Sequence, residues 1–153
     1  MDLILWRHAE AVDLDLVGDD FERYLTHKGE KHAARMAVWL ERQLPDRARV
    51  YSSPAVRAEQ TAQRLDRKFK TTGKLAPLST PDDLLELVQW PHAKGCTLVV
   101  GHQPMLGQTI SRLMGLAESE CAMKKGSVWW LRYREDHPRN KTVLVTVQSP
   151  DFL

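Results

Sequence analysis

The chain has 153 residues, and we expect a single domain over residues 1–153, because two domains would each have a marginal core. Hydrophobic residues make up 42% of the sequence and charged residues 27%, a balance typical of globular proteins. The 22 basic and 20 acidic residues leave a formal charge of +2. This small net charge gives no reason to expect nucleic acid or an anionic membrane as a partner.

The first residues are mostly apolar, but Arg7 and His8 interrupt them early. Such a run is too short for the apolar region of a signal peptide and far too short to span a membrane. We therefore expect a cytoplasmic protein. Cys96 and Cys121 lack the spacing of a metal site, and in a reducing compartment we expect both to be unpaired, small apolar side chains.

Short apolar runs alternate with segments of helical periodicity, which is typical of α/β domains. In the first half of the chain the elements are separated by capping residues and by proline. The pattern predicts a buried strand over 3–6, a helix between the cap Thr26 and Pro45, a strand over 49–52, and a helix capped by Ser53 that carries Leu65 and Phe69 on its apolar face.

The second half of the chain continues the alternation. It predicts a helix that starts at Pro81, a buried strand over 97–100, a helix from Pro104 to Gly115, and two strands over 127–134 and 142–148. The last two strands are expected to lie at one edge of the sheet. Together these elements predict a single three-layer α/β/α domain with a mostly parallel central sheet.

Two arginines and two histidines stand just after predicted strands. Arg7 and His8 follow the first strand, Arg57 lies soon after the second, and His102 follows the strand over 97–100. The carboxyl ends of parallel strands form the ligand crevice of such a sheet, so these side chains are expected to converge. Since Arg7 and His8 are consecutive, both can line one pocket only if the chain leaves the strand at about His8.

Guanidinium groups match the oxygens of a phosphoryl group, and a histidine with a pKa of ~6.5 is largely neutral at pH 7 and can attack without a separate base. One imidazole can act as the nucleophile, and the other can stabilise the transferred group together with the arginines. The sequence contains no H-x-x-x-H pair and no Walker-type glycine loop. We therefore expect phosphoryl transfer that needs neither a metal ion nor a cofactor.

Four ordered segments resemble the histidine phosphatase superfamily, also called phosphoglycerate mutase-like. They are L-W-R-H-A-E-A at 5–11, L-T-H-K-G at 25–29, S-S-P-A-V-R-A-E-Q-T at 52–61 and V-V-G-H-Q-P at 99–104. The R-H-A-E-A form and the short chain are most similar to the SixA type of phosphohistidine phosphatase within this superfamily. The resemblance implies a phosphoglycerate mutase-like fold.

The resemblance also implies roles for individual residues. His8 would be the nucleophile that becomes phosphorylated, and Arg7, Arg57 and His102 would form the phosphate pocket. The implied partner is a phosphorylated protein, such as a histidine-containing phosphotransfer domain, or a small phosphorylated metabolite. Position nine departs from much of the superfamily, since Ala9 stands where glycine is frequent.

Longer members of the superfamily supply a glutamate that protonates the leaving group, and no matching motif is visible here. Asp82, Asp83 and Glu86 lie in the corresponding stretch, but acidic residues in the first turn of a helix are equally explained by the helix dipole. Without an acid the substrate needs a good leaving group. A phosphoramidate such as phosphohistidine meets that requirement.

Two alternatives stay open at this point. The chain could hydrolyse small phosphomonoesters or nucleotides, because the pocket recognises only the phosphoryl group. It could also be a non-catalytic module that binds phosphate. The stretch from Glu10 to Tyr24 has no helical or strand periodicity and is expected to form a loop over the pocket.

Overall fold

A six-stranded sheet forms the centre of the computed structural model, which describes residues 1–139 and 141–153. Asn140, in the predicted connection between the last two strands, lies outside the described residues. The sheet has the order β3-β2-β4-β1-β5-β6. Its strands are β1 (Asp2–Arg7), β2 (Arg49–Ser52), β3 (Lys70–Thr71), β4 (Cys96–Gly101), β5 (Val128–Tyr133) and β6 (Thr142–Gln148).

The sheet is mostly parallel, as predicted. β1 pairs with β4, β4 with β2 and β2 with β3 in parallel, whereas β5 pairs in antiparallel fashion with both β1 and β6. The last two strands thus lie at one edge of the sheet, as predicted, and they pair with each other in antiparallel fashion. β1, β4 and β2 lie side by side, so their carboxyl ends meet at the same edge of the sheet.

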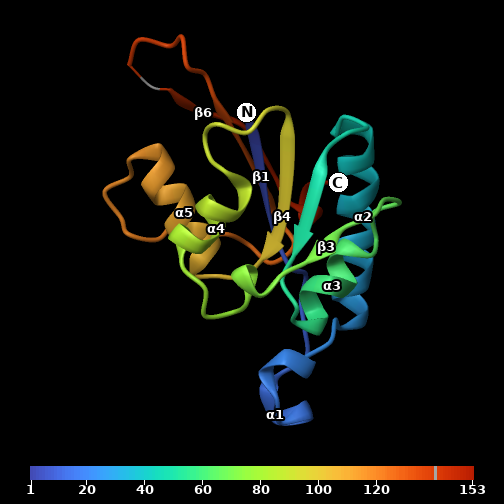
Figure 1. Cartoon of the computed structure of the whole chain (residues 1–153). Coiled ribbons are helices and arrows are strands. Elements are labelled where there is room, and N and C mark those ends of the chain that lie inside the picture. Colours follow the sequence, from blue (N-terminus) through green and yellow to red (C-terminus); the bar gives the residue numbers. More distant parts are fainter. Residues whose placement is uncertain (140) are drawn as a thin grey trace.

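Helices cover both faces of the sheet and complete the predicted three layers (Figure 1). On one side lie α2 (His27–Gln43) and α3 (Val56–Ala62), and on the other α4 (Pro81–Val88) and α5 (Met105–Met114). In the described part of the chain, no helix is both long enough and apolar enough to cross a bilayer. Shorter pieces are α1 (Leu14–Val17) and the 3₁₀ turns η1 (Asp20–Glu22), η2 (Gly73–Leu75) and η3 (Pro150–Phe152).

The two faces of β1 contribute side chains to two separate hydrophobic cores. Ile4 and Trp6 pack with residues of α2 and α3, whereas Leu3 and Leu5 pack with residues of α4 and α5. Every residue of β4, at the middle of the sheet, is buried. Burial on both faces explains why these strands read as continuous apolar runs rather than as alternating patterns.

The start of α2 after Thr26, the start of α4 at Pro81 and the end of α5 at Gly115 agree with the prediction. The Thr26 hydroxyl accepts a hydrogen bond from the Gly29 amide at 3.0 Å at the start of α2. Thr80 and Asp83 form a capping box at the start of α4. Gly115 ends α5 in the left-handed conformation, with φ of 65°. Local sequence therefore determines these boundaries.

The helix after β2 differs from the prediction. α3 begins at Val56 with Ala55 as its N-cap, so Ser53 does not cap it. The helix ends at Ala62, and Leu65 and Phe69 pack against the α2–α3 core from the segment that follows. The physical reason is that the Ser53 hydroxyl accepts from the Ala55 amide at 3.2 Å, in a turn before the helix, and not from an amide of the first helical turn. The same hydroxyl also contacts a histidine ring from another strand end, which local sequence does not reveal.

We predict that Leu98→Ala lowers the free energy of unfolding by about 2–5 kcal/mol, because Leu98 is fully buried in β4 and its loss leaves a cavity. Leu78→Ala is the matched control, since this leucine is 96% exposed, and it should change stability by no more than about 0.5 kcal/mol. Chemical denaturation measures both. Equal effects of the two changes would contradict the position assigned to Leu98.

Candidate active site

Backbone hydrogen bonds hold the ends of β1, β2 and β4 together. The His8 amide donates to the Gly101 carbonyl at 3.1 Å, and the Ser53 amide donates to the Val100 carbonyl at 3.0 Å. β1 ends at Arg7, as predicted, so His8 is the first residue beyond the strand. The rings of His8 and His102 lie with their centroids 5.1 Å apart and their planes at 56°.

His8 is held in one orientation by contacts at both ring nitrogens. Its Nδ1 lies 2.8 Å from the Ala9 carbonyl oxygen, which can only accept, so Nδ1 carries the proton. Nε2 then has a free lone pair, which accepts a hydrogen bond from Nε of Arg57 at 3.3 Å. The ring is buried, with 6% exposed, and presents its nucleophilic nitrogen to a guanidinium group.

Two of the other predicted site residues carry buried nitrogens without a partner. Nη1 of Arg7 donates to the Met123 carbonyl at 2.6 Å, but its Nε has no hydrogen-bond partner. Nδ1 of His102 is also unpaired. Ser111 Oγ is the third such side-chain atom in the described structure, and it lies elsewhere, on α5. Since buried polar groups are normally satisfied, each of these two nitrogens is suited to a hydrogen bond with a bound ligand.

Asp20, which sequence analysis missed, accepts hydrogen bonds from both Nη atoms of Arg57. Nη1 of Arg57 donates to the Asp20 carbonyl at 2.6 Å, and Nη2 donates to its carboxylate at 3.1 Å. The same carboxylate accepts from Arg23 at 3.2 Å. Asp20 thereby leaves the Nε edge of the guanidinium turned toward His8. Its position in an aperiodic acidic stretch gave no signal of this role.

The supporting contacts join segments that are far apart in sequence. The Thr61 hydroxyl accepts from the Ala9 amide at 3.1 Å and donates to the Arg57 carbonyl at 2.8 Å, which links the segment after His8 to α3. Gly29 lies against Glu10, and a Cβ at this position would come within 2.0 Å of the Glu10 carbonyl oxygen. Only glycine allows α2 to approach this closely.

Both histidines of the site are held neutral. Burial lowers the pKa of His8 well below its ordinary value, and the neighbouring charges add to this effect against the hydrogen bond to Ala9. Burial, followed by the charge of Arg57, lowers the pKa of His102 to about 3. A nitrogen nucleophile must be unprotonated at the attacking atom, and a neutral imidazole provides such a nitrogen. A neutral imidazole can also donate a hydrogen bond from its other nitrogen.

The three carboxylates considered as acids are engaged elsewhere. Asp82 pairs with Arg112 at 2.6 Å, Asp83 belongs to the capping box of α4, and Glu86 lies 3.3 Å from Lys74. Within the described residues, none is hydrogen-bonded or ion-paired to either site histidine. Each of these carboxylates therefore has a partner other than the four predicted site side chains.

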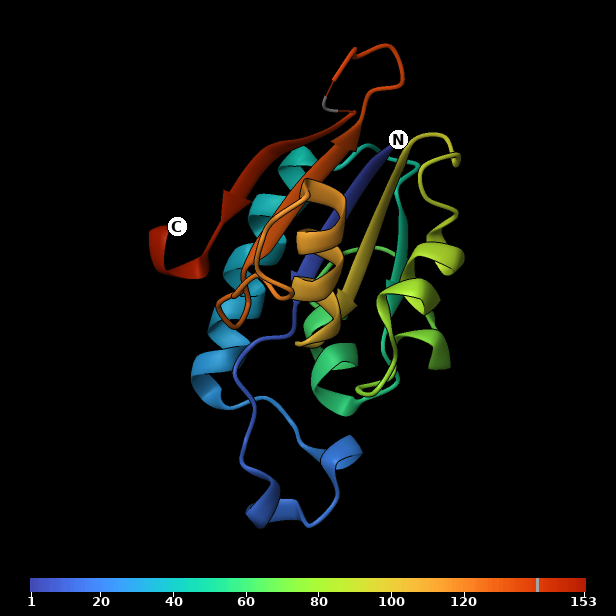
Figure 2. The ribbon, with the colours of Figure 1, turned by 90° about the vertical axis from the view of Figure 1, so that its left-hand side faces the viewer.

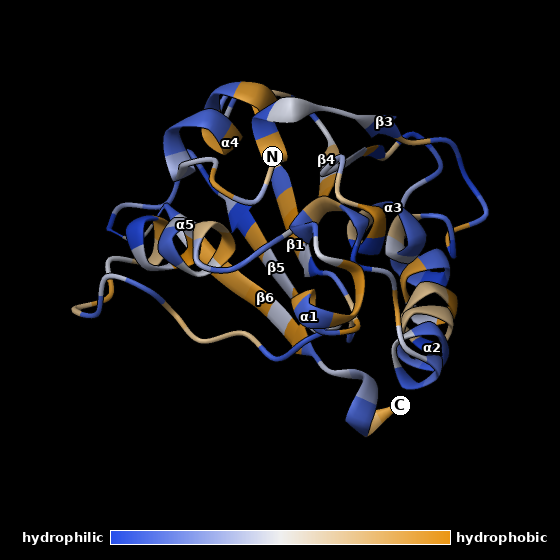
Figure 3. Ribbon diagram, turned by 90° about the horizontal axis from the view of Figure 1, so that it is seen from below, coloured by the Kyte–Doolittle hydropathy of each residue, from blue (hydrophilic) through white to orange (hydrophobic). Residues whose placement is uncertain are grey.

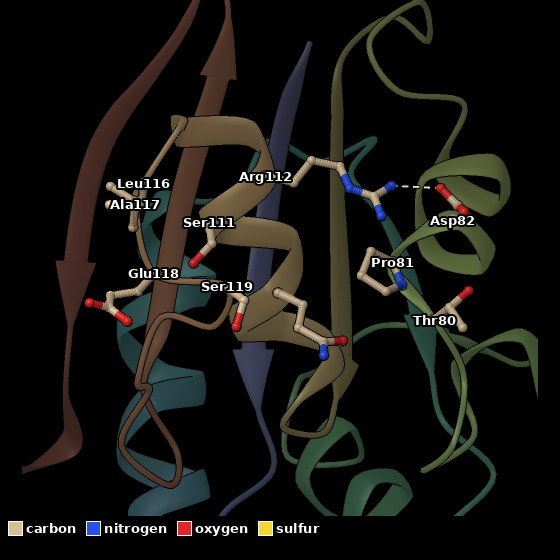
Figure 4. Close-up of a pocket in the computed structure, with 10 residues that line it drawn as sticks. Thr80, Pro81, Asp82, Ser111, Arg112, Leu116, Ala117, Glu118 and Ser119 are labelled. Carbon is tan, nitrogen blue, oxygen red and sulfur yellow. Dashed lines mark hydrogen bonds and ion pairs between the residues drawn. The ribbon is translucent and has the colours of Figure 1, made fainter.

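A separate pocket of about 540 Å³ lies between α4, α5 and the loop after α5 (Figure 4). The ion pair between Asp82 and Arg112 crosses it. The four convergent side chains do not line this pocket. Over residues 1–139 and 141–153, no group of three histidine, cysteine, aspartate or glutamate residues is arranged to hold a metal ion.

Comparison with known proteins agrees with this geometry. Residues 3–89 match the family model of the histidine phosphatase superfamily (branch 1). The chain is 30% identical to phosphohistidine phosphatase SixA of Escherichia coli over 121 residues, 74% of each protein. An uncharacterised protein of Picosynechococcus sp. is 31% identical to this chain, and the alignment covers 100% of this chain and 99% of that protein. The chain belongs to the histidine phosphatase superfamily.

Solved structures show the same fold. The structure of the protein histidine phosphatase SixA complexed with tungstate superposes with a TM-score of 0.78 at 24% identity, and 99% of each chain is covered. A candidate phosphohistidine phosphatase SixA from Nakamurella multipartitia has a TM-score of 0.77 at 26% identity, with 97% of this chain and 95% of that chain covered. The phosphoglycerate mutase-like fold predicted from the sequence is confirmed.

We predict that neither His8 nor His102 becomes protonated as the pH falls from 8 through the ordinary histidine pKa of ~6.5, because burial disfavours the imidazolium form of each ring. Nitrogen-15 NMR of the histidine rings measures this directly. The unfolded chain does take up these protons below its ordinary histidine pKa of ~6.5, so the free energy of unfolding should decrease as the pH falls through that region. A titration of either folded ring near pH 6.5 would contradict the assignment.

Proposed function

We propose that the protein is a metal-independent phosphatase that hydrolyses a phosphoryl group through a phosphohistidine intermediate on His8, and that it acts as a SixA-type phosphohistidine phosphatase. The observation that carries the proposal is the neutral His8 ring, whose Nε2 lone pair faces Arg57 at 3.3 Å beside the ring of His102. An imidazole nucleophile surrounded by donors suits attack on phosphorus.

The reaction proceeds in two displacements. The Nε2 lone pair of His8 attacks phosphorus, the bond from phosphorus to the substrate nitrogen breaks, and that nitrogen leaves with its electron pair and takes up a proton from solvent water. A water molecule then attacks the phosphoryl group on His8, its oxygen bonds to phosphorus, and it gives up a proton to solvent. The bond from phosphorus to Nε2 breaks with its electron pair returning to the ring, so inorganic phosphate departs and the neutral imidazole is restored. Arg7, Arg57 and His102 stabilise the charge on the transferred oxygens in both steps.

The carboxylate that does lie at the site is poorly suited to protonate a leaving group. Burial favours the protonated form of Asp20, but its hydrogen bonds with Arg23 and Arg57 outweigh this and hold its pKa below the ordinary value. An ionised carboxylate cannot donate a proton. This supports a substrate whose leaving group departs readily, and an imidazole leaves far more readily than an alkoxide.

Residues 13–24, which we call the lip, support a protein as the carrier of the phosphoryl group. The lip projects beyond the end of the sheet, opposite the connection between β5 and β6 (Figures 1 and 2). Asp20 ties it to Arg57. Hydrophobic and hydrophilic residues are mixed along it (Figure 3).

The surface of the lip combines exposed apolar and acidic side chains. Leu14 and Leu16 are 47% and 64% exposed, and Phe21 and Tyr24 are each 42% exposed. Exposed acidic residues stand among them, namely Asp13, Asp15, Asp19 and Glu22. Acidic groups repel small anionic metabolites, whereas apolar and acidic residues together complement a protein surface with apolar and basic residues. This favours a phosphorylated protein over a small phosphorylated metabolite.

The nucleophile is tested by trapping a radiolabelled phosphoryl group during turnover of a phosphohistidine protein. Label should attach to His8 in the unaltered protein and be absent in His8→Ala, whose turnover through the covalent route should be lost. Arg57→Ala should retain the nucleophile but lose ~10²–10³ in turnover, because one preorganised donor is removed.

His27→Ala is the control for these variants, since its side chain is 98% exposed and lies outside the site. It should label and turn over like the unaltered protein. Turnover without label on His8 would overturn the nucleophile assignment. Phosphate binding without hydrolysis of any phosphoramidate would show instead a non-catalytic binding module.

The role of the lip is tested with two substrates. Leu16→Ser combined with Phe21→Ser should lower kcat/KM by ~10-fold or more for a phosphorylated histidine-containing phosphotransfer domain, because apolar contacts in the complex are lost. Free phosphohistidine should be hydrolysed at an unchanged rate. Leu78→Ser, at a leucine that is 96% exposed and outside the lip, is the control. Equal losses with both substrates would argue against protein docking at the lip.

A further inference from the structure

Ser53 contacts the second histidine of the site directly. Its Oγ lies 2.6 Å from Nε2 of His102, although the two residues are 49 positions apart in the sequence. Both are buried, Ser53 with 0% and His102 with 3% exposed. A contact this short between a hydroxyl and a ring nitrogen is a hydrogen bond, and the remaining question is which of the two atoms supplies the proton.

The other contacts of the hydroxyl answer that question. Ser53 Oγ accepts a hydrogen bond from the Ala55 amide at 3.2 Å. If Nε2 of His102 also donated to it, the proton of the hydroxyl would need a third partner, and none is present among the described residues at this fully buried position. The arrangement is satisfied when the hydroxyl donates to Nε2. The proton of the neutral ring is then on Nδ1.

We propose that Ser53 is a positioning residue that fixes His102 as the Nδ1–H tautomer, so that Nδ1–H is the group that His102 offers to a bound phosphoryl oxygen. The proposal deepens the proposed function and rests on it for its catalytic meaning. Nδ1 of His102 is buried and has no partner, as expected of a donor whose acceptor is the substrate. The opposite tautomer would direct a lone pair at a dianion, which is repulsive.

The two histidines of the site thus use the same tautomer for opposite purposes. The Ala9 carbonyl holds the proton of His8 on Nδ1, and the bare Nε2 is left to attack. Ser53 holds the proton of His102 on Nδ1 as well, but there Nδ1–H is left to donate. The choice of tautomer matters because the ring is neutral: burial and the neighbouring charge of Arg57 lower the pKa of His102 to about 3. Arg7, Arg23 and Asp20 also act on this ring.

The tautomer is measured by two-bond proton–nitrogen NMR of the intact protein, before any activity is considered. In the unaltered protein we expect Nδ1 of His102 to carry the proton and Nε2 to have the shift of an unprotonated nitrogen. Adding inorganic phosphate should shift the Nδ1–H resonance, because the ligand becomes its acceptor. An Nε2–H tautomer of His102 in the unaltered protein would overturn the proposal by itself.

The variants test the cause. Ser53→Ala should allow both tautomers of His102 and lower kcat by at least ~10-fold, but by less than the ~10²–10³ expected when a donor is removed outright. KM should change little. Ser53→Thr keeps the hydroxyl and should restore the Nδ1–H tautomer and most of kcat.

Ser52→Ala is the matched control, since Ser52 is equally buried but its hydroxyl donates to the Ser53 carbonyl at 3.0 Å rather than to the ring. It should leave tautomer and kcat unchanged. Equal losses in Ser52→Ala and Ser53→Ala, or an unchanged tautomer in Ser53→Ala, would overturn the proposal. If the unaltered protein hydrolyses no phosphoramidate, the proposed function fails, while the NMR result still decides the role of Ser53.

Discussion

The buried guanidinium of Arg57 is the group on which the arrangement of the site depends. Only 4% of this residue is exposed, and a buried cation requires partners. Asp20 supplies a carbonyl and a carboxylate to its outer end, and Nε meets the ring of His8. Its backbone carbonyl holds Thr61, which in turn holds the Ala9 amide. One side chain thus joins the lip, α3 and the segment after β1.

Burial has a second consequence for the chemistry of the site. The same removal from water that makes Arg57 depend on Asp20 keeps the two neighbouring imidazoles neutral. In a neutral ring one nitrogen is a donor and the other an acceptor, so the partner of one nitrogen determines what the other presents. The Ala9 carbonyl and the Ser53 hydroxyl are these partners. Small polar groups behind the rings therefore decide which ring can attack and which can donate.

The sequence determined most of the fold because the signals were local and strong. The continuous apolar runs before Arg7 and Gly101 identified β1 and β4, and Thr26, Pro81 and Gly115 marked helix ends through hydrogen bonds or backbone conformation within a few residues. β3 and α1 were missed because elements of two and four residues are too short to show a period.

The sequence by itself also placed Arg7, His8, Arg57 and His102 at strand ends, and a parallel sheet brings such ends to one edge. Only the tertiary structure decided what those side chains touch. Asp20 lies 37 positions from Arg57 in the sequence. Ser53 was predicted to be a helix cap, but in the structure its hydroxyl is hydrogen-bonded to the ring of His102, 49 positions away. Such contacts depend on how separate elements pack against each other. The periodicity or spacing of residues within one segment cannot show which distant residue will be the hydrogen-bond partner of a buried side chain.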